Sequence, residues 1–300
     1  MAILSANFKS DLICLTRLEL AAEWGSTVQN VPDGDIVLAF LDSRRRRPSA
    51  RPRKVWIADD FICPPAHAAG WHSLQFEIVQ GIALVSRMSR RHASLANDDG
   101  LLNEWSVHHF HLGTSLKADG SGLIERTGPV VFARVTDNDF YAINVYEHGE
   151  WEEFSILESL HRNWPETIRQ YRLQGIKGEP ITEEQRRNLR KVNAQVATEM
   201  ADGTVYGPIG GGVMSSGDSA RARTGSDMLE SDVERLQVSI QEQLETFLPH
   251  LRASGYNEEP AIKAVLTNIT PQGFQVEFPD YGAGFNVTLE GGWFHRRRPS

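Results

Sequence analysis

Three of the chain's ten histidines lie within four positions, in the segment Val107-His-His-Phe-His-Leu112. The residues around them alternate in the way that is typical of a β-strand, whose successive side chains point to opposite faces. If the apolar residues of this strand pack inward together with His108, then His109 and His111 stand side by side on the other face. Neighbouring imidazoles can exchange protons near neutral pH. This pair is therefore the first candidate for catalytic chemistry.

Two further strand-like segments, Val130–Val135 and Phe140–His148, follow and are joined by the turn sequence Thr136-Asp-Asn-Asp139. The same alternation in the last strand points Asn144, Tyr146 and His148 outward and packs Tyr141, Ile143 and Val145 inward. Arg134 of the middle strand joins the outer face, and Arg126 precedes that strand as a second phosphate anchor. The predicted catalytic set is therefore His109, His111, His148, Arg134, Arg126 and Tyr146.

This set of side chains suits the cleavage of RNA without a metal or another cofactor. The 2′-hydroxyl must lose a proton, the departing 5′-oxygen must gain one, and guanidinium groups can stabilise the negative charge of the phosphorane. Two imidazoles and the guanidiniums of Arg126 and Arg134 supply these needs near neutral pH. Tyr146 can position a base or stack on it. The residues thus predict an endoribonuclease.

Two other hypotheses fit the same residues. In the first, His109 and His111 form an H-x-H zinc pair in a metal-dependent hydrolase, with His148 or Asp137 as the third ligand. No C-x-x-C or H-E-x-x-H motif accompanies this pair. In the second, the histidines are incidental polar residues of a half-exposed strand. The sheet and a long amphipathic helix then form a non-enzymatic interaction module that binds a protein partner.

The chain has one dense basic run, which Pro48 and Pro52 interrupt. These prolines favour an extended or looped backbone. A solvated loop is the usual interpretation of such a run, and contact with RNA phosphates is the alternative. A net charge of −8 argues against a surface that binds nucleic acid throughout, although a local patch remains compatible with it. The candidate RNA-binding residues are Arg44, Arg45, Arg46, Arg47, Arg51, Arg53 and Lys54.

The elements that must position these residues belong to an α+β fold. A length of 300 residues predicts about two domains, and 40% hydrophobic with 23% charged residues excludes a disordered, collagenous or coiled-coil chain. We predict a first domain at residues 1–178, in which helices precede a small antiparallel sheet. A smaller α+β domain at residues 179–300 is centred on one long amphipathic helix.

Hydrophobic periodicity predicts the individual elements. Short strands are expected at Leu12–Leu20, Ile36–Leu41 and Val55–Ile57, and a helix is expected from Pro64 to Gly81. Later helices are expected at Phe154–His161 and Glu166–Leu173, after Thr182 and over Ser226–Leu251. Thr182 and Gln185 have the spacing of a capping box.

The cellular location follows from what the sequence lacks. No apolar stretch reaches the roughly 20 residues that a membrane span requires, and no secretory signal is visible at the N-terminus. Cys14 and Cys63 are two thiols far apart in the sequence, which is typical of a reducing compartment. We therefore predict a cytoplasmic protein without a membrane partner.

The segment R-x-G-x-VVFARV-TDNDFYAINVYEHG, with a strand and helices before it, resembles the RelE/HigB-like ribonuclease toxins of bacterial toxin–antitoxin systems. Those proteins close a helix-helix-strand-strand-strand core with a stretch of roughly the form R-x-x-Y-x-h-x-x-D-x-h-h-h-h-h-x-x-H. The match covers about Trp71 to Trp151. The resemblance implies cleavage of messenger RNA without a metal, a ribosome partner and a neutralising protein partner. By position it also implies phosphate contacts for Arg126 and Arg134 and a catalytic role for His148.

Overall fold

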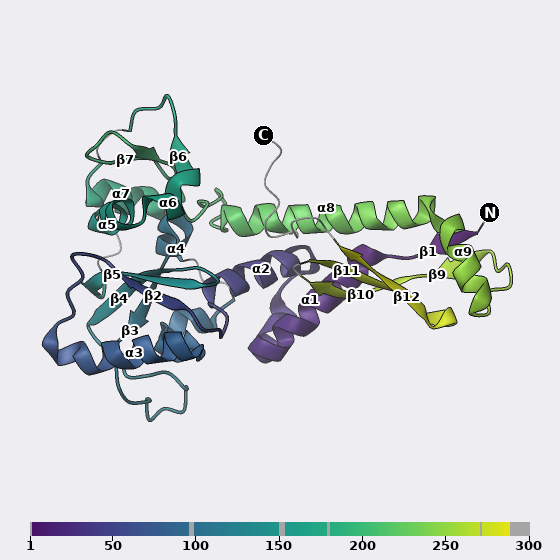
Figure 1. Ribbon diagram of the computed structural model, residues 1–300, viewed down its shortest axis with the longest axis horizontal. Coiled ribbons are helices and arrows are strands. Elements are labelled where there is room, and N and C mark those ends of the chain that lie inside the picture. The colour runs from purple at the N-terminus through teal and green to yellow at the C-terminus, as the bar shows by residue number, and fades with distance from the viewer. Residues whose placement is uncertain (1, 96–98, 150–153, 179–180, 271, 289–300) are drawn as a thin grey trace. The chain divides into compact units, whose positions relative to one another are not determined.

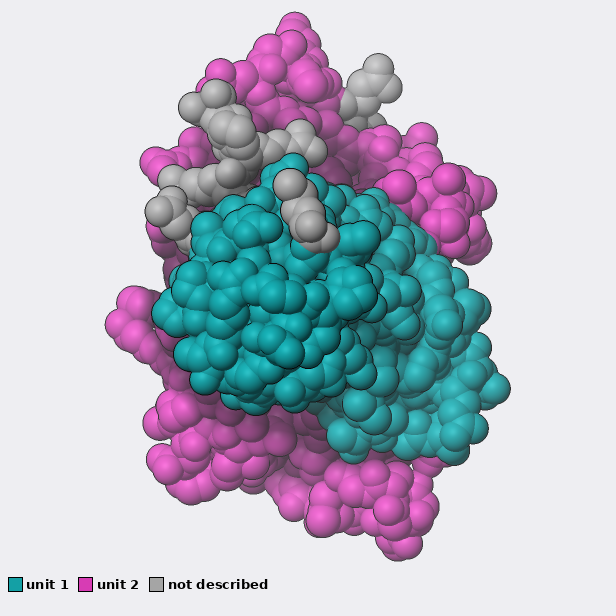
Figure 2. Space-filling view, turned by 90° about the vertical axis from the view of Figure 1, so that its right-hand side faces the viewer, with its two compact units in different colours: residues 1–41, 222–300 teal, residues 42–221 magenta. Residues whose placement is uncertain are grey.

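The computed structural model describes residues 2–95, 99–149, 154–178, 181–270 and 272–288 (Figure 1). The chain forms two compact units, one of residues 1–41 and 222–300 and one of residues 42–221, which Figure 2 colours separately. The fold is α+β, as the sequence predicts. The predicted boundary near residue 178 is corrected, because the first 41 residues belong with the C-terminal unit. Pairing between segments so far apart leaves no local signal in the sequence.

The unit of residues 42–221 is built on a four-stranded sheet. Its strands are β2 (Lys54–Ile57), β3 (Val107–His111), β4 (Pro129–Val135) and β5 (Asp139–Glu147), in the order β2-β5-β4-β3. The antiparallel meander predicted for β3, β4 and β5 is confirmed. The sheet also gains β2, which pairs with β5 in parallel.

Helices cover both faces of this sheet (Figure 1). On one face α3 (Ala68–Gln80) packs against residues of β3, β4 and β5 that include Phe110, Val131 and Phe140. On the other face α5 (Ser155–Asn163) and α6 (Pro165–Ile168) pack against Phe132 and its neighbours. Both faces of the sheet are therefore hydrophobic cores.

A smaller group of elements completes this unit. It contains α4 (Gly100–Trp105), α7 (Glu183–Lys191) and a sheet in the order β6 (Arg172–Leu173), β8 (Val205–Tyr206), β7 (Thr198–Glu199). The capping box is confirmed, since the Gln185 amide N–H donates to Thr182 Oγ1 at 3.2 Å and the Thr182 amide N–H donates to Gln185 Oε1 at 2.7 Å. The helix predicted over residues 166–173 ends at Ile168, and β6 follows it.

A buried carboxylate joins α7 to α4. Glu104 lies in an almost fully buried position, where Arg186 pairs with its Oε1 and Arg190 Nε donates to its Oε2 at 2.6 Å. The same two guanidiniums lie over the Trp105 ring, about 5 Å from its centroid. These contacts hold α4 in place, and β3 begins two residues after this helix ends.

The other unit contains α1 (Phe8–Trp24), most of α8 (Ala220–Glu242) and α9 (Leu244–Ala253). Its β1 (Ile3–Ser5) pairs in parallel with β9 (Ala261–Lys263). An antiparallel sheet follows, with β10 (Val265–Thr270), β11 (Gly273–Phe278) and β12 (Ala283–Thr288) in that order. The single long helix predicted over Ser226–Leu251 begins earlier, at Ala220, and is interrupted at Gln243.

The strands predicted over Leu12–Leu20 and Ile36–Leu41 are wrong, because both segments are helical. In α1 every fourth residue from Phe8 to Trp24 is buried, but the middle one is Thr16, whose hydroxyl donates to the Leu12 carbonyl at 2.8 Å. This polar member hid the helical period. The second segment lies in α2 (Ile36–Arg46), and its unbroken apolar run fits a buried strand equally well.

Short 3₁₀ turns connect several elements. They span Gly25–Asn30, Asp33–Asp35, Pro65–His67, Leu84–Arg87, Arg90–Ala93, Arg169–Tyr171 and Pro279–Tyr281. Across the described residues, none of the helices combines the length and the apolar character that crossing a bilayer requires.

The approach of α3 to the end of β3 requires a glycine. A Cβ atom at Gly70 would lie 1.8 Å from the Leu112 carbonyl oxygen, which is backbone and cannot move aside. We expect Gly70→Ala to lower the free energy of unfolding by about 2 kcal/mol, because overpacking displaces the helix from the sheet. Urea denaturation measures this loss. Gly100→Ala is the matched control, since its Cβ meets only Arg190 Cδ at 3.7 Å; an equal loss in both variants would contradict this account.

Candidate functional site

Three imidazole rings meet at one end of the sheet. The ring centroids of His109 and His111 are 6.5 Å apart, and the ring of His148 lies 6.2 Å from the first and 5.8 Å from the second. The rings of His111 and His148 are stacked, with an angle of 14° between their planes. The structure thus brings together the three predicted histidines, which come from β3 and from the residue that follows β5.

The strand register explains this convergence. His109 lies opposite Phe132 and His111 opposite Val130, and Val130 lies in turn opposite Tyr146 on β5. Residues paired in this way share a face of the sheet. His108 points to the opposite face, where its ring lies 6.1 Å from that of Phe110, as the alternation predicts.

The three histidines differ in their access to solvent. His109 and His111 lie inside the packed layer and are 9% and 1% exposed, whereas His148 is exposed. Arg126 is also exposed, and its Nη2 donates a hydrogen bond of 3.5 Å to His148 Nε2. A ligand from solvent can therefore reach His148 and Arg126 directly, with the other two rings behind them.

Burial and nearby positive charge lower the pKa of His111 and of His148. Burial, with help from Arg126 and His148, lowers the pKa of His111 to about 4, against a small opposing effect of the Thr127 backbone. Burial first and Arg126 second also lower the pKa of His148. A neutral imidazole accepts a proton, and the bond from Arg126 marks Nε2 of His148 as the unprotonated nitrogen. His148 is therefore suited to be a general base at neutral pH.

His111 is unusual for a buried polar residue. Within the described part of the chain, neither of its ring nitrogens has a hydrogen-bond partner. Buried polar groups are normally paired, and an unpaired one costs about 1–3 kcal/mol. Its backbone, in contrast, is firmly held: the carbonyl oxygen accepts from Nη1 of the buried Arg87 at 3.1 Å.

Two residues that we did not predict from the sequence hold the end of β3. Arg87 donates to the Gly113 carbonyl at 3.3 Å, and its Nη2 pairs with Glu77 Oε1 at 2.6 Å. Thr127 Oγ1 accepts from the Leu112 amide at 3.1 Å. Arg87 lies 24 residues before His111 and outside any strand, so only its position in space identifies it as a support of the site.

The structure places two other predicted site residues differently. Arg134 lies opposite Val107. It is four residues along β4 from Val130, the residue opposite His111, and four residues of a strand span roughly 13 Å. It therefore lies outside the histidine cluster. The ring of Tyr146 packs on Phe132 at 4.9 Å between centroids, and its hydroxyl is 2.9 Å from Ser155 Oγ. These contacts hold the ring of Tyr146 between Phe132 and the start of α5.

A β-bulge corrects the alternation predicted for β5. The register between β4 and β5 shifts between Phe132 and Ala133, so that one residue of β5 is left over. Tyr141 and Ile143 consequently pack on the histidine face, whereas Val145 packs towards α3.

Asn144 was predicted to point outward together with Tyr146 and His148, but its side chain contacts the loop after β2. Asn144 Oδ1 accepts from the Ile62 amide at 2.9 Å, and its Nδ2 donates to the Asp60 carbonyl at 3.3 Å. Asn144 therefore fixes the loop after β2 and does not join the histidines.

The first part of the basic run is helical and not looped, because α2 continues to Arg46, whereas residues 48–53 lie outside helices and strands, as predicted. Arg46 is 1% exposed, and its guanidinium donates to the Ser94 and Leu95 carbonyls at 2.8 and 3.0 Å. Arg45 bonds Asn103 Oδ1, and the buried Arg53 donates from Nε to the Thr136 carbonyl at 2.7 Å. The guanidiniums of Arg45, Arg46 and Arg53 are therefore engaged with oxygen atoms of the protein itself.

The rest of the run is divided between ion pairs and surface. Arg51 pairs with Asp137 at 3.4 Å, and the Lys54 ammonium lies 3.5 Å from the centroid of the Trp56 ring. Arg44 is exposed and Arg47 half-buried. The predicted RNA-binding run is therefore no continuous basic surface.

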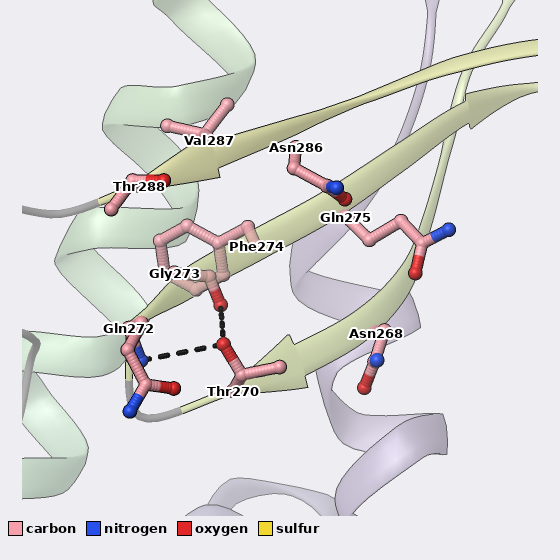
Figure 3. Close-up of a pocket in the computed structure, with 9 residues that line it drawn as sticks. All are labelled: Asn268, Thr270, Gln272, Gly273, Phe274, Gln275, Asn286, Val287 and Thr288. Atoms are coloured by element: carbon pink, nitrogen blue, oxygen red, sulfur yellow. Dashed lines mark hydrogen bonds between the residues drawn. The ribbon is translucent and has the colours of Figure 1, made fainter.

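The unit of residues 1–41 and 222–300 contains a shallow hollow of about 300 Å³ on the sheet of β10, β11 and β12 (Figure 3). Thr270 Oγ1 donates to the Gly273 carbonyl at 3.4 Å beside it. Its lining carries amides and hydroxyls but no carboxylate, imidazole or amine, so it offers no acid–base chemistry. The lining residues are Asn268, Thr270, Gln272, Gly273, Phe274, Gln275, Asn286, Val287 and Thr288.

The zinc hypothesis requires three converging ligands. Within the described residues, no group of three His, Cys, Asp or Glu side chains is arranged to hold a metal ion. The stacked planes of His111 and His148 explain why, since stacked rings direct their nitrogens past each other.

Comparison with known proteins adds no assignment to this geometry. No family model matches the chain, and neither a curated protein nor a solved structure matches it.

The lowered pKa of His111 predicts a pH dependence of stability. Between pH 6.5 and about 4 the unfolded chain binds a proton that folded His111 does not, so the free energy of unfolding must fall as the pH falls through this window. The loss amounts to about 3 kcal/mol. We expect His111→Leu to flatten this part of the profile in urea denaturation. His72→Gln, at an exposed histidine, should leave it unchanged; an unaltered profile in His111→Leu would refute the burial argument.

Proposed function

We propose that this protein is a metal-independent endoribonuclease whose reactive edge is formed by His148 and Arg126. The observation that supports this function is the exposed imidazole–guanidinium contact of 3.5 Å in front of two buried imidazoles. The neutral His148 ring can accept a proton while the adjacent guanidinium binds a phosphate. These are the two groups that cleavage by a 2′-hydroxyl needs first.

In this mechanism the Arg126 guanidinium turns from His148 Nε2 to the phosphate. The freed Nε2 takes the proton of the 2′-hydroxyl, and the 2′-oxygen attacks the adjacent phosphorus. The bond from phosphorus to the 5′-oxygen breaks, which leaves a 2′,3′-cyclic phosphate and a 5′-hydroxyl end. His111, with a pKa of about 4, is neutral at pH 7 and cannot donate the proton that the 5′-oxygen needs. We assign that proton to water, and Arg126 stabilises the charge on the phosphorane.

The wider biological proposal follows from the resemblance to RelE/HigB-like toxins. The antiparallel β3–β4–β5 meander, with α3 before it, is the part of the fold that agrees with that expectation. The parallel strand β2 and the cover of α5 and α6 have no counterpart in the pattern that carried the resemblance. We propose a toxin-like bacterial defence role, in which messenger RNA is cut free or on the ribosome and a protein partner neutralises the activity.

An exposed apolar strip on the outer side of α3 favours a protein partner. Phe76 and Val79 are 61% and 51% exposed one helical turn apart, and Ile82 follows at 47%. Such a strip is suited to contact with another protein. It supports the neutralising partner, and it also supports the second candidate function, an interaction module without catalysis. Catalytic variants separate the two.

The decisive experiment incubates purified protein with RNA in the presence of a chelator. We expect cleavage that leaves 2′,3′-cyclic phosphate ends, and no cleavage of the same sequence with 2′-O-methyl groups. His148→Ala and Arg126→Ala should each lower the rate by about 100-fold or more. The rate should be level near pH 7 and fall in acid, because the pKa of His148 lies below its usual value.

His72→Ala and Arg169→Gln are the matched controls, since both residues are exposed on the same unit and belong to neither β3 nor β5. They should retain the full rate. Intact RNA in every reaction, both with free RNA and with ribosomes, would reject catalysis and leave the interaction module.

A further inference from the structure

Three guanidiniums gather at the start of β3, at the opposite end of that strand from the histidine cluster. Arg134 lies on β4 opposite Val107, the first residue of β3. Arg45 lies near the end of α2, and its guanidinium donates from Nη1 to the Leu102 carbonyl of α4 at 3.4 Å, in the helix that ends two residues before β3. The Arg45 guanidinium and Arg134 therefore both lie near the start of β3.

Asn103 connects Arg45 to the segment that carries the third guanidinium, that of Arg221. Its side-chain oxygen accepts from Arg45, and its carbonyl oxygen accepts from the Gly212 amide at 2.9 Å. The Gly212 carbonyl in turn accepts from the Ala220 amide at 2.9 Å, where α8 begins. Arg221 follows and packs on Gly211, so closely that a Cβ there would lie 2.8 Å from Arg221 Cβ. The loop that contains Gly211 and Gly212 thus holds Arg221 near Arg45 and Arg134.

Among the described residues, Arg134 and Arg221 have no anionic partner, and Arg45 has one. Arg134 is 8% exposed, and among the described residues its Nε and Nη1 bond nothing; Nε of Arg45 is also unbonded. Arg45 has Asp42 at 3.2 Å, but within the described chain no carboxylate pairs with Arg134 or Arg221. Burial, reinforced by the charge of Arg221, lowers the pKa of both Arg134 and Arg45. Buried cations without an anion are costly, and a bound anion would relieve that cost.

We propose that Arg134, Arg221 and Nε of Arg45 form a binding site for a phosphate group. Guanidinium N–H groups match the oxygens of phosphate in geometry and charge. Arg221 is exposed and forms the entrance, whereas the other two lie deeper, so the site takes a compact, terminal phosphate and not the middle of an RNA strand. The site is independent of the proposed cleavage at His148, from which it is separated by the length of β3.

Calorimetric titration of the full chain with inorganic phosphate tests the site, with sodium chloride at equal ionic strength as the reference. We expect saturable binding to the natural protein and binding at least tenfold weaker in Arg221→Gln, whose exposed side chain is dispensable for folding. Arg169→Gln removes the same charge from another exposed position and should bind normally. Equal weakening in both variants, or heat that chloride reproduces, would overturn the proposal.

Arg134→Leu provides a second test. Because it removes a buried cation that has no anionic partner, it should fold and should lose phosphate binding. Retained binding in a folded Arg134→Leu protein would refute the site. If this variant does not fold, Arg221→Gln alone decides.

Two ligands distinguish the sources of the phosphate. Tighter binding of a 5′-phosphorylated dinucleotide than of its 5′-hydroxyl form would identify the end of an RNA strand, whereas binding of inorganic phosphate alone would identify a free ion. Either result supports the site when Arg221→Gln weakens it. RNA cleavage by Arg221→Gln should stay at the natural rate, so failure of phosphate binding and failure of the nuclease proposal remain distinguishable.

Discussion

The register of β3 between the end of α2 and the strand β4 decides where each polar side chain of the sheet lies. With His111 opposite Val130, two imidazoles share the face that also carries Phe132, and with Val107 opposite Arg134 the guanidinium is placed at the far end of the same face. A shift by one residue would exchange both faces. Arg87 secures this register by binding the last carbonyls of β3, and the close contact of Gly70 holds α3 against them.

Because of this register, the polar side chains of β3 and β4 on the histidine face lie in a row beneath the hydrophobic layer that α5 and α6 form. The helices α5 and α6 bury the middle of the histidine face, and the exposed His148 lies at one end of it. Burial then decides protonation, since a charged imidazole loses more solvation than a neutral one. The site therefore presents one accessible imidazole next to a guanidinium and keeps the deeper His111 ring neutral, an arrangement suited at pH 7 to accepting a proton beside a bound anion.

Local patterns predicted the parts of this fold that depend on neighbouring residues. The alternation in Val107–Leu112 correctly separated His108 from its neighbours, and the spacing of Thr182 and Gln185 predicted the capping box. Predictions were wrong where tertiary contacts override the pattern. Thr16 hid the period of α1, the bulge in β5 separated Val145 from Ile143, and carbonyl partners drew Arg46 and Arg53 out of the predicted basic surface. No short sequence pattern reveals these contacts.

Among the described residues, His111 and Arg134 are buried and carry side-chain nitrogens that bond nothing, and these two residues are the strongest link between this fold and a function. A chain selected for stability alone would place an apolar residue at His111 or Arg134, because replacing a buried, unpaired polar group by a well-packed apolar one is often neutral or stabilising. Both groups lie on one face of one sheet, and each lies beside an exposed arginine, Arg126 in one case and Arg221 in the other. Departures from local consistency concentrate at functional sites. Because both departures repeat the same combination of a buried donor or acceptor behind a surface guanidinium, a phosphate-bearing ligand accounts for the two with one chemistry.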